Sequence, residues 1–207
     1  MTRGRIAAGL GIASLAAVVV WATLGSTQGE NTPARTIDEH LTRRQPAPTP
    51  NLGLRVLQRG DPGQFADAWD RAAADGKVRL AELRGIPLLV NIWASWCDPC
   101  QREAPRLRDA WRDVGRSGVL FVGINTQDKH DDAIAFDGYF RLTYPSLVNQ
   151  SGSVLDAFRA TGIPQTYFLD RSGRIVAHVV GETSRVELRA GIEAAQSGDV
   201  VAPLRGN

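Results

Sequence analysis

An apolar run, two cysteines and a helix-like pattern follow one another directly between Pro87 and Arg116. The run "PLLVNIWA" is short and lies between Gly85 and the cysteines, which predicts a buried strand. A strand that feeds directly into a helix predicts a layered α/β domain with Cys97 at the junction. The apolar residues that recur at helical spacing after it are Ala104, Leu107, Ala110, Trp111 and Val114.

The pattern of strands and helices changes near Thr143. Before it, residues 118–125 predict a second buried strand and residues 131–142 a helix. After it, the sequence predicts a strand, a short helix ended by Gly162, two strands joined at residues 171–173, and a closing helix over residues 183–195. A turn that short makes its two strands antiparallel. The expected fold class is therefore α/β, with a mixed central sheet flanked by helices.

The first 25 residues have the pattern of a membrane or export segment. Arg3 and Arg5 precede an uncharged run, residues 6–24, which at about 1.5 Å per residue spans roughly 28 Å. We expect a signal anchor that leaves the rest of the chain outside the cytoplasm, and a cleaved signal peptide with secretion of the mature chain is the alternative. Residues 26–50 contain "RRQPAPTP", which predicts an extended extracytoplasmic tether before a domain over residues 51–207.

Cys97 and Cys100 are the only cysteines of the chain. A structural disulfide is the usual reading in an exported protein, but a bridge between residues this close constrains almost no loop. Cys97 lies where a helix begins, so free backbone N–H groups and the helix dipole favour its thiolate. Cys100 lies one turn deeper on the same face. This arrangement predicts Cys97 as the nucleophile and Cys100 as the resolving thiol in disulfide exchange.

The stretch "VNIWASWCDPCQREAP" resembles the active site of thioredoxin-fold proteins, and within them the membrane-anchored TlpA/ResA/CcmG(DsbE)-like thiol-disulfide oxidoreductases. The resemblance covers residues 76–195 and includes "TGIPQTYF", where the family carries a cis proline that faces the disulfide. It implies a thioredoxin fold with Pro164 as that proline, and a cleft in which the backbone of Ile163 and Pro164 pairs with an extended substrate segment. It also implies reduction of protein disulfides outside the cytoplasm, most often in apocytochromes c during cytochrome c-type biogenesis.

Two positions near the cysteines bear on proton transfer. Asn91 stands where thioredoxins usually carry a buried aspartate, and an amide cannot shuttle a proton. Glu103 matches a glutamate of the TlpA/ResA-like proteins, and its carboxylate would take the proton of Cys100. A plain helix-start role for Glu103, favoured by the helix dipole, is the alternative.

Asp98 adds negative charge beside Cys97, which opposes the helix dipole and favours a weaker oxidant. The residues expected to flank the bound substrate are Trp96, Asp98 and Pro99, together with Ile163 and Pro164.

Other cysteine chemistries fit the sequence less well. A zinc site needs three or four ligands, and the three histidines are scattered along the chain. A Sco-type copper site needs one more residue between its cysteines, and haem attachment needs a histidine where Gln101 stands. A peroxiredoxin would carry its cysteine in a P-x-x-x-T-x-x-C motif, which this chain lacks. We therefore expect neither a metal nor another cofactor.

The sequence thus predicts a single-pass, membrane-tethered protein disulfide reductase that acts in cell redox homeostasis. Its expected partners are protein thiols or disulfides of the apocytochrome c kind and a membrane thiol-electron donor; a formal net charge of +2 gives no reason to expect nucleic acid, and we expect a monomer. Two alternatives stay open. One is a catalyst that forms disulfides in secreted proteins, since direction depends on reduction potential. The other is a non-catalytic docking module with an inert disulfide, which solvent access distinguishes because a reactive pair must expose Cys97.

Overall fold

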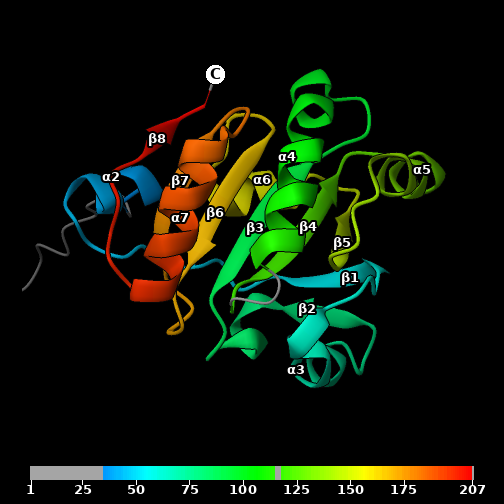
Figure 1. The fold of residues 1–207 in the computed structure, drawn as a ribbon, viewed down its shortest axis with the longest axis horizontal. Coiled ribbons are helices and arrows are strands. Elements are labelled where there is room, and N and C mark those ends of the chain that lie inside the picture. Colours follow the sequence, from blue (N-terminus) through cyan, green and yellow to red (C-terminus); the bar gives the residue numbers. More distant parts are fainter. Residues whose placement is uncertain (1–34, 115–117, 207) are drawn as a thin grey trace, which may run out of the picture. The chain divides into compact units, whose positions relative to one another are not determined.

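The computed structural model describes residues 35–114 and 118–206, and these form one layered α/β unit (Figure 1). Within them, eight strands form a single sheet in the order β2-β1-β5-β4-β3-β6-β7-β8. The strands are β1 (Gly53–Gln58), β2 (Lys77–Arg79), β3 (Leu88–Trp93), β4 (Leu120–Thr126), β5 (Ser146–Asn149), β6 (Gln165–Leu169), β7 (Ile175–Val180) and β8 (Leu204–Arg205). The α-helices are α2 (Ile37–Thr42), α3 (Ala66–Ala72), α4 (Asp98–Val114), α5 (His130–Phe140), α6 (Ser153–Phe158) and α7 (Arg185–Ser197).

The sheet is mixed, as the sequence predicts. β3 pairs with β4 in parallel and with β6 antiparallel, and β6 and β7 form the antiparallel pair expected around residues 171–173. Every residue of β3, β4 and β6 is buried, which explains why these strands read as apolar runs. The predicted mixed central sheet is therefore confirmed.

Helices cover both faces of the sheet, with α4 and α7 side by side on one face and α6 on the other (Figure 1). The packing of α7 on β6 depends on Gly191, because a Cβ atom there would lie 2.3 Å from the ring of Phe168. Just before α7 begins, Glu182 and Thr183 contact Arg102, Glu103 and Arg106 in the first half of α4. The site described below lies at that end of both helices.

Residues 35–50 are not an extended tether, and this part of the sequence prediction is wrong. They begin with α2, whose first turn is closed by reciprocal hydrogen bonds between Thr36 and Glu39. Leu41 is fully buried, and Ala47 exchanges two backbone hydrogen bonds with Ile175 of β7. The segment thus folds onto the edge of the sheet because its few apolar side chains find partners there.

Two smaller differences concern the strands and helices themselves. β1 and β8 were not expected, and α6 ends at Phe158 rather than Gly162 because Arg159 adopts a left-handed conformation with φ 52°.

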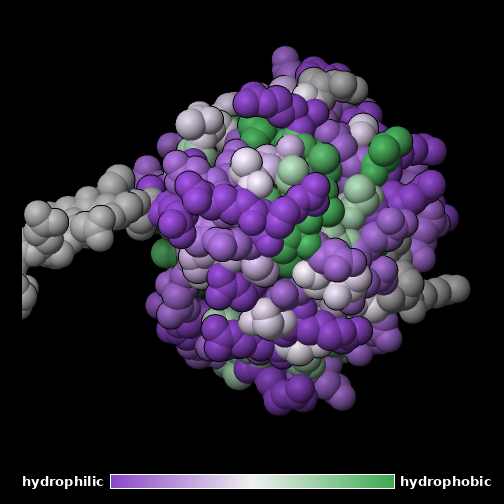
Figure 2. All heavy atoms as spheres, turned by 90° about the vertical axis from the view of Figure 1, so that its left-hand side faces the viewer, coloured by the Kyte–Doolittle hydropathy of each residue, from purple (hydrophilic) through white to green (hydrophobic). Residues whose placement is uncertain are grey.

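Figure 2 views the side of the molecule on which α2 and β8 lie, and hydrophilic residues cover most of it around a narrow apolar strip.

The expected signal anchor, residues 1–25, and the first part of the expected tether, residues 26–34, lie outside the described residues. Within residues 35–114 and 118–206, no helix combines the length and the apolar character needed to cross a bilayer.

Candidate active site

The two cysteines lie where β3 gives way to α4, as the sequence predicts. Their Sγ atoms are bonded at 2.07 Å and their Cα atoms are 5.2 Å apart. Cys97 immediately precedes the helix, and the backbone N–H of Cys100 donates a hydrogen bond to Cys97 Sγ at 3.2 Å. In the reduced protein such a donor would favour the Cys97 thiolate, because it stabilises negative charge on that sulfur.

The exposure of the pair differs from the expectation. Cys97 is the more accessible of the two residues, but it is only 4% exposed, against 1% for Cys100. The prediction that Cys97 is open to solvent is therefore wrong for this disulfide-bonded state. Both cysteines belong to the buried apolar cluster of the domain, so neighbouring side chains cover them.

The residues just before Cys97 are fixed by the loop that follows β4. Asp128 accepts hydrogen bonds from the backbone N–H of Ser95 at 2.6 Å and from its hydroxyl at 2.8 Å. The indole N–H of Trp96 donates to the carbonyl of Gln127 at 2.9 Å, while its side chain stays 58% exposed. A hollow of about 620 Å³ lies over this junction and is lined by Ser95, Trp96, Gln127, Asp128, Lys129, Asp132 and Gln150.

Trp96 and Asp98 are thus exposed beside the disulfide, and Pro99 is half-buried between the cysteines. This is where the sequence places a bound substrate. Asp128 and Gln127 were not predicted, because nothing in their local pattern indicates a contact with residues about 30 positions earlier.

The Ile163–Pro164 peptide bond is cis, as the family resemblance implies. Gln165 pairs with Ile92, so Pro164 lies at the end of β3 from which the cysteine loop departs. The carbonyl of Pro164 accepts a hydrogen bond from Gly181 N at 3.1 Å, and a proline has no N–H to donate. Pro164 therefore has no backbone N–H to offer a substrate, and its carbonyl is already hydrogen-bonded. Of the two residues expected to pair with substrate, Ile163 is the one whose backbone groups would form the hydrogen bonds.

Glu103 lies one turn after Cys100 and is fully buried. Asn91 Nδ2 donates to its Oε1 at 2.8 Å, and the backbone N–H of Thr183 donates to its Oε2 at 2.8 Å. Asn91 and Thr183 are joined in turn through Thr166, with hydrogen bonds of 3.0 Å and 3.1 Å. Burial raises the pKa of Glu103 to about 7, and these hydrogen bonds together with the charge of Arg106 oppose that rise.

This geometry gives Asn91 a definite place: it does not titrate, but it donates to the carboxyl group that does. Thr166 and Thr183 were not predicted as site residues. One signal for Thr183 was present, since Ser184 and Glu187 form a capping box that fixes the start of α7 directly after it.

A second buried carboxyl group lies elsewhere in the domain. Asp137 of α5 accepts hydrogen bonds from Ser146 Oγ at 3.0 Å and Gln58 Nε2 at 2.9 Å. Burial raises its pKa to about 7, against the effect of both hydrogen bonds. Neither cysteine is among its hydrogen-bond partners, and Asp137 was not predicted as a site residue.

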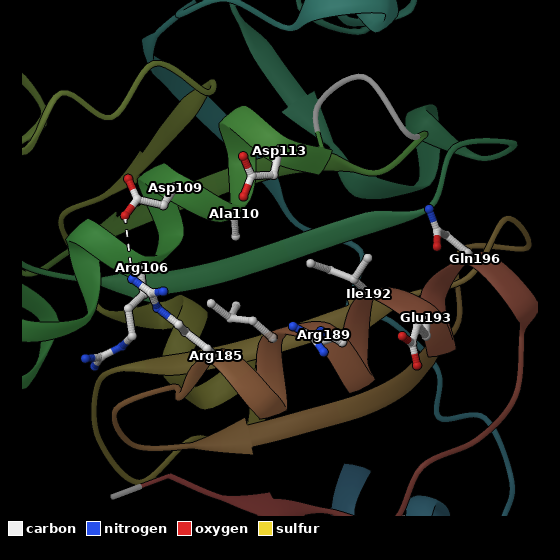
Figure 3. Close-up of a pocket in the computed structure, with 10 residues that line it drawn as sticks. Arg106, Asp109, Ala110, Asp113, Arg185, Arg189, Ile192, Glu193 and Gln196 are labelled. Atoms are coloured by element: carbon white, nitrogen blue, oxygen red, sulfur yellow. Dashed lines mark ion pairs between the residues drawn. The ribbon is translucent and has the colours of Figure 1, made fainter.

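A groove of about 440 Å³ separates α4 from α7 (Figure 3). Leu188, Ile192 and Ala110 give it an apolar lining, and an ion pair between Asp109 and Arg185 bridges the two helices at 4.0 Å. None of the predicted site residues lines this groove, so the hollow beside Trp96 is the one adjacent to the chemistry. No group of three or more His, Cys, Asp or Glu side chains in the described parts of the chain is placed to hold a metal ion.

Comparison with known proteins agrees with this geometry. Residues 62–178 match the AhpC/TSA family. The thiol-disulfide oxidoreductase ResA of Geobacillus thermodenitrificans is 26% identical over 116 residues, which cover 56% of this chain and 67% of that protein. The ResA of Oceanobacillus iheyensis is 32% identical over 104 residues, covering 50% and 54%. The chain therefore spans between about half and two thirds of these curated relatives.

Among solved structures, a thioredoxin-family thiol:disulfide interchange protein of Chlorobium tepidum TLS superimposes with a TM-score of 0.57 at 23% identity, covering 73% of this chain and 97% of that one. The structure of MTB dsbF, in mixed oxidised and reduced forms, gives 0.57 at 26% identity and covers 70% and 96%. With the matching family model, the fold and the cysteine pair at the start of α4, the chain belongs to the AhpC/TSA family of thioredoxin-like proteins.

Proposed function

We propose that this thiol-disulfide oxidoreductase works as a reductant of protein disulfides outside the cytoplasm, with apocytochromes c as its substrate class. The observation that supports it most directly is the Cys97–Cys100 disulfide at the start of α4, one helical turn from the buried carboxyl group of Glu103. A purely structural disulfide needs no such neighbour.

The reaction begins with the reduced pair. The Cys97 thiolate attacks one sulfur of the substrate disulfide, a mixed disulfide forms, and the other substrate sulfur leaves as a thiolate that takes up a proton. Cys100 then loses its proton to the Glu103 carboxylate and attacks Cys97 Sγ. The second substrate sulfur leaves and takes up a proton, so the substrate ends as a dithiol and the protein as its disulfide. A membrane thiol-electron donor would return the pair to the reduced state.

Substrate binding uses the groups around the disulfide. The backbone of Ile163 would pair with an extended segment of the substrate as an added strand. Trp96 and Asp98, both exposed, would contact the residues that flank the substrate cysteine. The buried state of Cys97 requires this segment to move neighbouring side chains before its sulfur is reached.

One feature favours the reducing direction. Asp98 is exposed beside Cys97, where its negative charge opposes the dipole of α4 and destabilises the thiolate. A pair whose reduced form is less stabilised is a stronger reductant. The names of the ResA relatives agree with a thiol-disulfide exchange function, and the apocytochrome substrate rests on the family resemblance alone.

The test uses two variants and the wild-type protein. Cys97→Ser should abolish reduction of a protein disulfide, and Cys100→Ser should accumulate a mixed disulfide through Cys97, visible by mass spectrometry. A trapped adduct in Cys97→Ser instead would reverse the two roles. If neither cysteine of the reduced protein reacted with iodoacetamide, the inert docking module would replace the enzyme.

Direction is measured separately, as the reduction potential against a glutathione couple. A potential more oxidising than that of the glutathione couple would mean that the protein forms disulfides and does not reduce them. The location outside the cytoplasm is tested by fractionation of cells. A signal anchor keeps the chain in the membrane fraction after a high-salt wash and leaves the domain open to added protease, whereas a soluble mature chain would mean cleavage and secretion.

A further inference from the structure

The segment between β7 and α7 donates a hydrogen bond to Glu103 and accepts one from Arg106. Thr183 N donates to Glu103 Oε2 at 2.8 Å, and Arg106 Nε donates to the carbonyl of Thr183 at 2.8 Å. The guanidinium group of Arg106 also forms an ion pair with Glu182. Arg106 therefore binds two consecutive residues of this segment, and Figure 3 shows it between α4 and the start of α7.

We propose that Arg106 is a positioning residue for thiol-disulfide exchange: with Glu182 it fixes the Thr183 peptide against Glu103 and sets the pH at which Glu103 exchanges its proton with Cys100. This inference rests on the proposed function, because a proton acceptor is needed only where Cys100 resolves a mixed disulfide. Arg106 does not touch the sulfurs, so its effect passes through the carboxyl group.

Arg106 and Glu182 are partly buried, which strengthens the effect of their charges on the titration of Glu103. The side chains of Arg106 and Glu182 are 27% and 14% exposed, so solvent screens them less than it screens a surface pair. Burial acts to raise the pKa of Glu182, but hydrogen bonds from Arg106 and Arg102 hold it below its ordinary value. Glu182 therefore stays ionised and neutralises part of the charge of Arg106.

The surroundings of Glu103 contain few charges. The groups that bind it or act on its charge are Arg106 of α4, Asn91 of β3, Tyr144 before β5 and Thr183 before α7. Thr166 of β6 links Asn91 to Thr183, and Glu182 pairs with Arg106. Burial and nearby carboxylates raise the pKa of Tyr144 well above its ordinary value, so it stays neutral through the relevant range. Changes in the Arg106–Glu182 pair thus act on Glu103 without a competing titration.

Arg106 and Glu182 shift the titration midpoint of Glu103 in opposite directions. Replacing each in turn therefore distinguishes an electrostatic role from a purely structural one. Arg106→Gln removes a positive charge that stabilises the carboxylate and should raise the midpoint of its titration. Glu182→Gln keeps an oxygen that accepts from Arg106 but leaves the arginine charge uncompensated, so it should lower the midpoint. A clamp with only a structural role would move both variants in the same direction, or neither.

The midpoint is read from the ¹³C chemical shift of the Glu103 carboxyl carbon across pH, in the disulfide-bonded full domain, with Glu103→Gln used to assign the signal. We expect Arg106→Gln to raise it by about 0.5 to 1 pH unit, Arg106→Lys to restore most of the wild-type value, and Glu182→Gln to lower it. Arg108→Gln, a matched control on α4 whose partner is Asp109, should leave it unchanged. An unchanged midpoint in Arg106→Gln, or shifts of the same sign in Arg106→Gln and Glu182→Gln, would overturn the proposal.

A second measurement keeps this inference separate from the proposed function. The rate at which the reduced protein reacts with oxidised glutathione should show the same shifts in its pH profile. If the wild-type protein failed to react, the reductase function would fall, while the carboxyl titration would still decide the role of Arg106.

Discussion

Glu103 is a buried carboxyl group held by hydrogen-bond donors from two elements, Asn91 of β3 and Thr183 before α7. Its side chain is fully buried, and burial raises its pKa to about 7. Asn91 and Thr183 each donate to a different oxygen, which limits that rise and keeps the ionised form accessible. A group whose pKa lies near the ambient pH both accepts and returns a proton readily. This is the property that a resolving thiol requires of its neighbour.

Glu103→Gln tests this assignment, because the variant keeps the size and hydrogen-bonding capacity of the side chain and removes its titration. We expect resolution of the mixed disulfide to slow by roughly 10- to 100-fold. We expect the alkylation rates of both thiols, measured across pH, to show an inflection near neutral pH in the wild type and to lose it in this variant. Glu193→Gln, an exposed glutamate of α7, is the control. Superimposable profiles with unchanged turnover would leave Glu103 a helix-start residue.

The sequence identifies only part of this site, for a reason that lies in chain distance. Cys97, Cys100 and Glu103 fall within seven residues at one helix start, so spacing alone places them together. The contacts of Thr183 with Glu103 and with Arg106 join residues 80 and 77 positions apart. No local pattern reports such contacts. The burial of Cys97, at 4% exposure, was also missed.

Among the helices and strands, α2 shows most clearly why a folded segment can be missed in the sequence. It is six residues long, too short to be stable alone in water, and it lies among prolines and polar residues. Its stability comes from the Thr36–Glu39 capping box, the burial of Leu41, and a 2.7 Å contact between Asp38 and His178 of β7. The central strands were predicted correctly because their whole length is buried. α2 offers only one fully buried side chain as a signal.

Leu41→Ala tests whether α2 is part of the folded domain. Because Leu41 is fully buried, its truncation should lower the free energy of unfolding by about 2 to 4 kcal/mol, measured by urea denaturation. Thr42→Ala, which changes the exposed neighbouring residue of the same helix, should cost well under about 1 kcal/mol. Equal stabilities for the two variants would mean that residues 35–50 are a tether and not part of the folded domain.

Taken over the whole molecule, the two buried carboxyl groups link stability to pH. Burial raises the folded-state pKa of Glu103 and of Asp137 to about 7, whereas their ordinary values are 4.5 and 3.8. Between those limits the folded chain holds protons that the unfolded chain releases. The resulting stabilisation is fully present below the ordinary pKa values and is lost as pH rises through about 7. Asp38 and Glu182 act in a separate, more acidic range, because their pKa values lie below the ordinary ones.

We therefore expect the disulfide-bonded protein to be more stable toward urea at about pH 5.5 than at about pH 8, by up to roughly 2 kcal/mol for each carboxyl group. The double variant Glu103→Gln/Asp137→Asn removes both carboxyl groups while keeping their acceptor oxygens, and it should lose most of the difference. Glu193→Gln should retain it. A double variant with the wild-type pH dependence would mean that neither carboxyl group holds its proton in the folded state, and that Glu103 is ionised throughout the range in which Cys100 needs an acceptor.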